Sequence, residues 1–150
     1  MKVSAIGRAA IMQREGCRLD AYPDTRGIIT IGVGHTGMTS PPKPYEGMKI
    51  SLTQADAFLA ADLAPVEARI NEALKRRPTQ NEFDAMASLA FNIGINGFGG
   101  CHVVRAFNDG ETKAAANAFL FWDKPEDLIN RRREERAQFL TPDGTYKLPT

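Results

Sequence analysis

Long apolar runs are missing from this sequence of 150 residues. No stretch approaches the roughly 18 consecutive apolar residues that a membrane span requires. The apolar residues near the N-terminus are interrupted by Arg8, Arg14 and Glu15, which is atypical of a secretion signal and typical of an amphipathic helix. We therefore expect a protein that accumulates in the cytoplasm of the cell that makes it, without stable membrane association.

Cysteine is also scarce, and the spacing of Cys17 and Cys101 fits no metal site. Because the sequence has no secretion signal, we expect two reduced thiols, with a single disulfide as the alternative. No metal or organic cofactor is implied.

Charge of one sign is not in excess, since 19 Lys and Arg residues face 18 Asp and Glu residues, for a formal net charge of +1. Such a balance gives no global field that would attract nucleic acid. The basic runs Lys75–Arg77 and Arg131–Arg133 contain no interleaved aromatic residues, so we interpret them as solvated helix faces. Glu134 and Glu135 would pair locally with the second run. Attraction of these runs to an anionic cell surface is the alternative.

The N-terminal third of the sequence predicts a helix followed by a small antiparallel sheet. Ser4 is a suitable cap for a helix that ends near Gly16, a residue suited to the left-handed conformation. Residues 19–33 contain β-branched residues and a turn at Pro23–Gly27, which indicates two or three short strands. Residues 36–47 are rich in proline and glycine and predict a loop.

The rest of the sequence is predominantly helical in pattern. Thr53–Asp56 resembles a helix cap, and Pro65 should kink or split the helix that follows. Thr79–Glu82 is a capping box that opens a helix with apolar residues nearly all round, and this predicts a central buried helix ending at Gly94. Further expectations are a flexible turn at 94–100, helices near 103–107, 111–121 and 125–140, and an extended tail after 140.

Segregated strands and helices indicate an α+β fold. We expect one domain, residues 1–150, with two lobes and a cleft between them as the ligand site. The β-rich lobe would take residues 16–52, and the helical lobe would take residues 1–15 and 80–150. Residues 53–78 would form the connecting helix.

Two carboxyl groups and a hydroxyl in the N-terminal third suit acid–base chemistry. Glu15 falls at the C-terminal end of a helix, where the dipole favours the protonated acid. Asp24 falls in a solvated turn, where the ionised form is stable, and Thr30 on the next strand could hold a water beside it. A protonated acid near an ionised carboxylate is what glycoside hydrolysis requires. Each of these residues is also common at its position for structural reasons alone. The spacing by itself therefore leaves both a catalytic and a structural role open.

The order and spacing of these residues resemble the phage-type lysozymes, glycoside hydrolase family 24. The resemblance lies in Glu15–Gly16, Ala21–Gly27 and Thr30–His35, and it continues in Leu89–Gly94 and in Trp122 with the Arg-rich helix after it. It implies a muramidase that cleaves between N-acetylmuramic acid and N-acetylglucosamine in peptidoglycan, as an endolysin of a lytic phage. The expected stereochemical outcome is inversion, and the protein would reach the periplasmic wall only on release.

The resemblance assigns a role to each of the three polar residues. Glu15 would be the general acid, Asp24 the second carboxylate, and Thr30 would help to hold the attacking water. Lytic transglycosylases usually work without a second carboxylate, so Asp24 favours hydrolysis. No nucleic acid is expected as a partner, and we expect a monomer.

Four further positions are candidates for substrate contact. His35 could touch the substrate, or it could pair with a carboxylate such as Asp62. Phe91 and Asn92 lie near the end of the central helix, where Phe91 could instead belong to the core. Asn117 resembles an asparagine of the family that faces the substrate, with a shift of one residue. Trp122 is more typical of a core residue than of a sugar platform.

Some features depart from the family pattern. Cys101 stands where relatives often have a small hydroxyl residue, and the loop 36–47 is longer and richer in proline than expected. A different class of function is a lysozyme fold kept as a peptidoglycan-binding or scaffold module with little catalysis. The retention of Glu15, Asp24 and Thr30 argues against that alternative.

Overall fold

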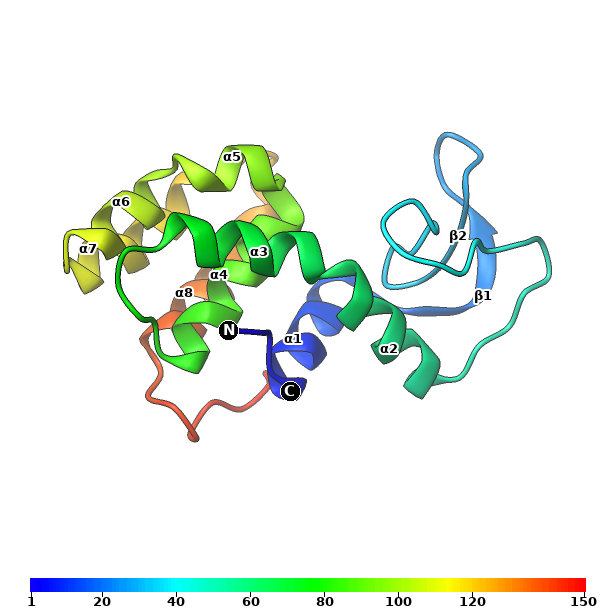
Figure 1. The fold of residues 1–150 in the computed structure, drawn as a ribbon, viewed down its shortest axis with the longest axis horizontal. Helices are drawn as coiled ribbons and strands as arrows, with labels where there is room; N and C mark the ends of the chain where they lie inside the picture. Colours follow the sequence, from blue (N-terminus) through cyan, green and yellow to red (C-terminus); the bar gives the residue numbers. More distant parts are fainter. The chain divides into compact units, whose positions relative to one another are not determined.

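The computed structural model describes residues 1–150 and confirms the α+β fold class. It contains one two-stranded antiparallel sheet, eight α-helices and two short 3-10 helices (Figure 1). None of the helices is both long and apolar enough to cross a membrane. In chain order the elements are α1 (Ala5–Glu15), β1 (Arg18–Pro23), β2 (Ile29–Gly32), α2 (Leu52–Asp62), α3 (Ala64–Ala73), α4 (Gln80–Ile93), α5 (Ile95–Gly99), α6 (His102–Asn108), α7 (Thr112–Ala118), η1 (Phe119–Phe121), η2 (Glu126–Leu128) and α8 (Ile129–Leu140).

The chain divides into two compact units. Residues Arg8–Ala64 form one, which we call the β unit. Residues Met1–Gly7 and Pro65–Thr150 form the other, which we call the helical unit. The β unit is therefore one continuous segment, whereas the helical unit is assembled from two segments that the β unit separates.

The sheet of the β unit is a short hairpin. Tyr22 pairs with Thr30 across β1 and β2, and an irregularity in β1 precedes this pair. An isolated bridge between Asp20 and Lys49 ties the loop before α2 to β1. The small core beneath the hairpin is apolar. β-branched residues such as those of the strands pack well on a half-buried sheet surface. The buried members of this core are Ile31, Ile50 and Ala55.

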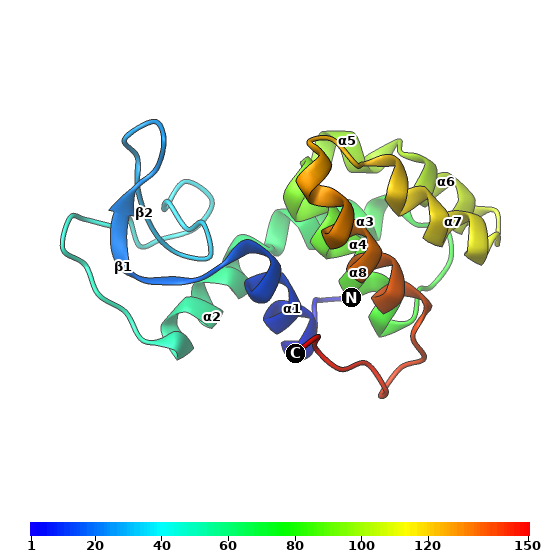
Figure 2. The same cartoon turned by 180° about the vertical axis from the view of Figure 1, so that it is seen from behind.

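Helix α4 is the centre of the helical unit. Thr79 and Glu82 form the predicted capping box, in which each side chain accepts a hydrogen bond from the backbone of the other. Nearly every residue from Asn81 to Ala90 is buried, which confirms the prediction of a central helix. Helix α8 packs along α4, as both views of the chain show (Figures 1 and 2).

Segments near both ends of the chain attach to the N-terminal part of α4. Ser4 donates through its hydroxyl and its backbone N–H to the carboxylate of Asp84. From the C-terminal tail, Asp143 accepts hydrogen bonds from the backbone N–H groups of Gln80 and Asn81, at 2.9 Å each. These N–H groups belong to the first turn of the helix. The N–H groups of a first turn have no acceptors within the helix itself.

Three local predictions are wrong. The cap of α2 is Ser51, whose capping box with Gln54 begins two residues before Thr53. Residues 94–100 contain the helix α5 instead of a flexible turn, because Phe98 is fully buried and anchors the segment. The helix after residue 125 begins only at Ile129, after a turn of 3-10 helix.

Pro65 has the effect that the sequence predicts. Helix α2 ends at Asp62 and α3 begins at Ala64, so the expected connecting helix is split. Pro65 is the second residue of α3, where the missing N–H would have no partner in the helix. The two helices are therefore separate elements joined at Leu63.

The prediction of solvated helix faces is wrong for the second arginine run. Arg132 is 0% exposed and Glu135 is also fully buried, whereas Arg133 is exposed. Arg132 and Arg131 both pair with Glu135, at 2.6 and 3.3 Å. The local pairing was expected, but its burial was not, because the partners of the arginines include residues from α4 and the segment at Trp122.

Candidate active site

Glu15 is the last residue of α1 and is exposed. The helix stops because Gly16 adopts φ 83°, a left-handed conformation that favours glycine, and its N–H donates to Met12 at 2.9 Å. This break directs the chain from α1 into β1. Close by, Cys17 is a partly buried free thiol, and burial raises its pKa, which keeps it uncharged. Cys101 is likewise a free thiol.

Asp24 lies in the turn between β1 and β2. Its Oδ1 accepts hydrogen bonds from the backbone N–H groups of Arg26 and Ile28, at 2.8 and 2.9 Å. Its own backbone bonds to Ile28 and Gly27 close the turn. The side chain is therefore held in one orientation by the loop it sits in, and its Oδ2 makes no hydrogen bond within the protein.

Thr30 stands on β2, two residues after Ile28, and is 4% exposed. Its hydroxyl donates to the carbonyl oxygen of Ile28 at 3.0 Å. Because the hydroxyl proton is used in this bond, the lone pairs of Oγ1 remain available to accept a hydrogen bond. The structure thus attaches Asp24 and Thr30 to the same residue, one through its N–H and the other through its carbonyl.

His35 is 1% exposed, and both ring nitrogens have partners. Nδ1 lies 2.7 Å from Oδ2 of Asp62, which is the partner the sequence suggested, and Nε2 lies 2.7 Å from the carbonyl oxygen of Pro42. Ser40 donates to the other oxygen of Asp62 at 2.6 Å. The ring also packs on Phe58, with the centroids 4.7 Å apart. His35 therefore fastens the long loop after β2 to the end of α2.

The remaining predicted site residues belong to the helical unit. Phe91 and Asn92 are half-buried at the end of α4. Oδ1 of Asn92 accepts from Arg132, a contact that the sequence did not suggest. Asn117 is exposed on α7, and its Oδ1 accepts from Nε of Arg136 at 2.9 Å. The structure thus places Glu15, Asp24, Thr30 and His35 in one unit and Phe91, Asn92 and Asn117 in the other.

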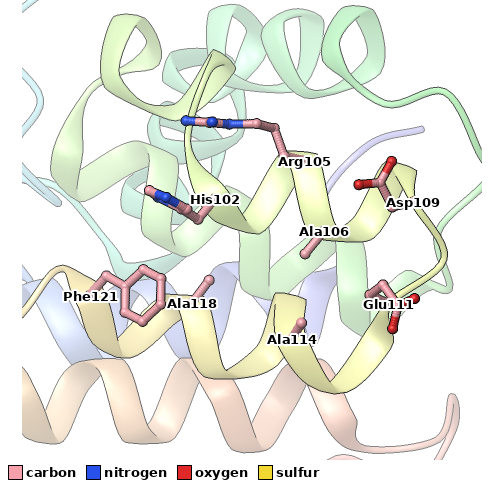
Figure 3. A pocket seen from close by; sticks show the side chains of 8 residues that line it. All are labelled: His102, Arg105, Ala106, Asp109, Glu111, Ala114, Ala118 and Phe121. Carbon is pink, nitrogen blue, oxygen red and sulfur yellow. The ribbon is translucent and has the colours of Figure 1, made fainter.

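A separate pocket of about 320 Å³ lies between α6 and α7. Figure 3 shows His102 and Phe121 at one end and the carboxylates of Asp109 and Glu111 at the other, with alanines between them. The ring of His102 meets that of Phe121 edge to face, with the centroids 5.3 Å apart. None of the predicted site residues lines this pocket.

Comparisons with known proteins agree with this fold. The phage lysozyme family matches residues 12–135. The endolysin of Salmonella phage P22 is 43% identical over 145 residues, which cover 94% of this chain and 99% of that protein. A crystal structure of a P22 lysozyme mutant superposes with a TM-score of 0.89 at 44% identity, covering 94% of this chain and 99% of that chain. The endolysin of Escherichia coli O157:H7 phage FAHEc1 superposes with a TM-score of 0.86 at 37% identity, covering 98% and 97%.

Fold and relatives together define a glycoside hydrolase of the lysozyme type. The chain belongs to the phage lysozyme family. Its function is that of a phage endolysin, a muramidase whose substrate is peptidoglycan.

Proposed function

We propose that the protein is an N-acetylmuramidase in the strict sense, which hydrolyses the β-1,4 bond between N-acetylmuramic acid and N-acetylglucosamine. Glu15, Asp24 and Thr30 perform the reaction. The observation that carries the proposal is the attachment of Asp24 and Thr30 to one residue, Ile28, with Oδ2 of Asp24 and the lone pairs of Thr30 left for a ligand. Two acceptors held by one peptide segment are suited to orient a single water molecule.

Glu15 is the general acid of this scheme. Its carboxyl proton passes to the glycosidic oxygen as the bond from that oxygen to the anomeric carbon breaks. Glu15 is the last residue of α1 and is exposed, so its carboxyl group is accessible to a substrate. The reaction leaves Glu15 ionised, and solvent restores its proton.

Asp24 is the general base. A water that donates one hydrogen bond to Oδ2 of Asp24 and another to Oγ1 of Thr30 would have its oxygen lone pair directed at the anomeric carbon. Asp24 takes the proton as the water oxygen bonds to that carbon on the face opposite the leaving group. This scheme inverts the configuration, since the water attacks directly and no covalent sugar–enzyme intermediate forms.

The proposal extends to the residues that bind the substrate. Phe91, Asn92 and Asn117 would contact sugar rings or their substituents. For His35 we propose a structural role instead, because its ring is buried and both nitrogens have partners. We further propose that the enzyme is a monomer of one two-lobed domain, residues 1–150. It would accumulate in the host cytoplasm and act on the periplasmic wall once the inner membrane is permeabilised.

The test is clearing of purified Gram-negative peptidoglycan by the wild type, Glu15→Gln and Glu46→Gln. Glu46 is an exposed glutamate of the same unit, so its replacement is the matched control. The products are reduced with borohydride and weighed. Clearing with new reducing ends by the wild type and the control, and none by Glu15→Gln, is expected.

Two other results would point elsewhere. Anhydro ends in place of reducing ends would identify a transglycosylase. If the folded wild type fails to clear and still sediments with the wall, the protein is a binding module with little catalysis.

A further inference from the structure

Arg132 on α8 is a fully buried arginine with all three guanidinium nitrogens in use. Nε donates to the carbonyl oxygen of Trp122 at 2.8 Å, and Nη1 donates to Oε1 of Glu135 at 2.6 Å. Nη2 donates to Oδ1 of Asn92 at the end of α4. A planar guanidinium with three fixed partners has one orientation, so it fixes the position of whatever it holds.

The other side of this network is equally constrained. Oε2 of Glu135 accepts from the hydroxyl of Ser88 at 2.6 Å and from Nε of Arg131 at 3.3 Å. Arg131 in turn donates to the carbonyl oxygen of Ser88 at 3.0 Å. Glu135 is therefore held from two helices, and it cannot release Arg132 to a different rotamer without leaving buried groups unpaired.

The network decides which way the carboxamide of Asn92 faces. The terminal torsion of asparagine has two nearly equal orientations, so a partner on one atom chooses between them. Because Oδ1 accepts from Arg132, the two N–H donors of Nδ2 face away from the guanidinium, and they make no hydrogen bond within the protein. If the amide turned over, Nδ2 would meet a cation that offers no acceptor.

Asn92 lines a pocket of about 310 Å³ together with Lys124, Arg132 and four apolar residues. An oriented amide donor beside apolar side chains suits a small group that combines a carbonyl oxygen with a methyl. The acetamido substituent of an amino sugar is such a group, and peptidoglycan carries one on each ring. The apolar wall of the pocket consists of Ile93, Trp122, Pro125 and Leu128.

We propose that Arg132 is a positioning residue that holds the carboxamide of Asn92 as a donor to the carbonyl of a substrate acetamido group. The inference rests on the proposed function, since it assigns part of the same substrate. On this proposal, the buried pair of Arg132 and Glu135 serves to fix the orientation of the Asn92 amide. An apolar residue at this position would fill the space but would leave the amide of Asn92 free to turn over.

Arg132→Met tests this with little electrostatic disturbance. Removal of the Arg132 guanidinium leaves Arg131 paired with Glu135, so the buried carboxylate keeps an opposite charge. Arg133→Met is the matched control, since Arg133 is exposed on the same helix and its one contact, to Asn130, is 3.4 Å long. Arg132→Lys is the second variant, because lysine keeps the charge beside Glu135 and cannot hold three partners at once.

The probe is tetra-N-acetylchitotetraose, with its deacetylated form as the comparison, and NMR follows the side-chain amide of Asn92. In the wild type, the acetylated sugar shifts this amide resonance and binds more tightly than the deacetylated one. Arg132→Met, Arg132→Lys and Asn92→Ala should each weaken binding of the acetylated sugar by about three- to tenfold, the worth of one hydrogen bond. The double variant Arg132→Met with Asn92→Ala should lose no more than either single variant.

The inference is overturned if folded Arg132→Met or Arg132→Lys keeps the wild-type preference for the acetylated sugar. It is equally overturned if the wild type binds the sugar with no change at the Asn92 amide. Failure of the proposed function looks different, because binding would follow the expected pattern while the wild type cleaves no peptidoglycan. If Arg132→Met does not fold, the Arg132→Lys and Asn92→Ala variants carry the test.

Discussion

His35 and Asp62 form a pair in which Nδ1 of the buried imidazole lies 2.7 Å from Oδ2 of the carboxylate. The pair joins His35, in the turn after β2, to the last residue of α2. Ser40 and Pro42, from the loop between β2 and α2, form hydrogen bonds with the same pair. The rigidity of the β unit therefore depends on a polar contact as well as on its small apolar core.

Replacing the carboxylate of this pair should destabilise the protein. Asp62→Asn keeps the size of the side chain but weakens the bonds to His35 and Ser40, and we expect a loss of about 1–3 kcal/mol in the free energy of unfolding. Urea denaturation measures it. Asp56→Asn on the same helix is the control, because the Arg8–Asp56 pair is partly exposed and should contribute less than about 1 kcal/mol. Equal losses in the two variants would contradict the assignment.

Asp24→Asn should separate structure from catalysis. The amide oxygen can still accept from the N–H groups of Arg26 and Ile28, so the turn and the free energy of unfolding should be preserved. The loss of the base should lower kcat by a factor on the order of 10² to 10⁴. Steady-state clearing rates and thermal denaturation provide the two measurements. Asp20→Asn, an exposed change on β1, should leave kcat unchanged.

Thr30 should tolerate serine but not valine. Thr30→Val preserves the shape of the side chain and removes both the donor to Ile28 and the acceptor for water, so we expect kcat to fall on the order of 10²-fold. The lost hydrogen bond should also reduce stability by about 1 kcal/mol. Thr30→Ser keeps the hydroxyl and should remain close to the wild type. Similar rates for the two variants would remove Thr30 from the mechanism.

Asp84 should make stability depend on pH in the acid range. Burial raises its pKa above the ordinary value of 3.8, against the opposing effect of hydrogen bonds from Ser4 and Gln80. The folded protein then holds a proton that the unfolded chain has already released, so stability is greatest below the ordinary value and falls as the pH rises through the raised pKa. Unfolding of the wild type and Asp84→Asn across the range above pH 3.8 should show a shallower decline in the variant. A steeper decline in the variant would refute this.

The sequence predicts those parts of the site whose positions depend on residues close by in the chain. Proline, aspartate and glycine in Pro23–Gly27 define the turn that carries Asp24, and the position of Thr30 follows from the strand after it. The polar side chain of His35 directly after a strand suggested a carboxylate partner, and the structure confirms Asp62. The catalytic roles of Glu15, Asp24 and Thr30 remain predictions.

Burial of charge is what local pattern could not reveal. Arg132 stands between two other arginines, and nothing in that run distinguishes it as the buried one. Its environment is created by Asn92 and Trp122, which lie 40 and 10 residues away in the chain. The helix α5 was missed for the same reason, since its glycine-rich sequence is held in place by the buried Phe98.

The attachment of Ser4 and Asp143 to the same helix has a consequence for the order of folding during synthesis. Ser4 leaves the ribosome before the helix that it binds, whereas Asp143, which accepts from the first N–H groups of that helix, emerges after it. The β unit is continuous and has all of its residues available when Ala64 has emerged. We therefore expect the β unit to be able to fold on the nascent chain, while the N-terminal segment waits for a partner.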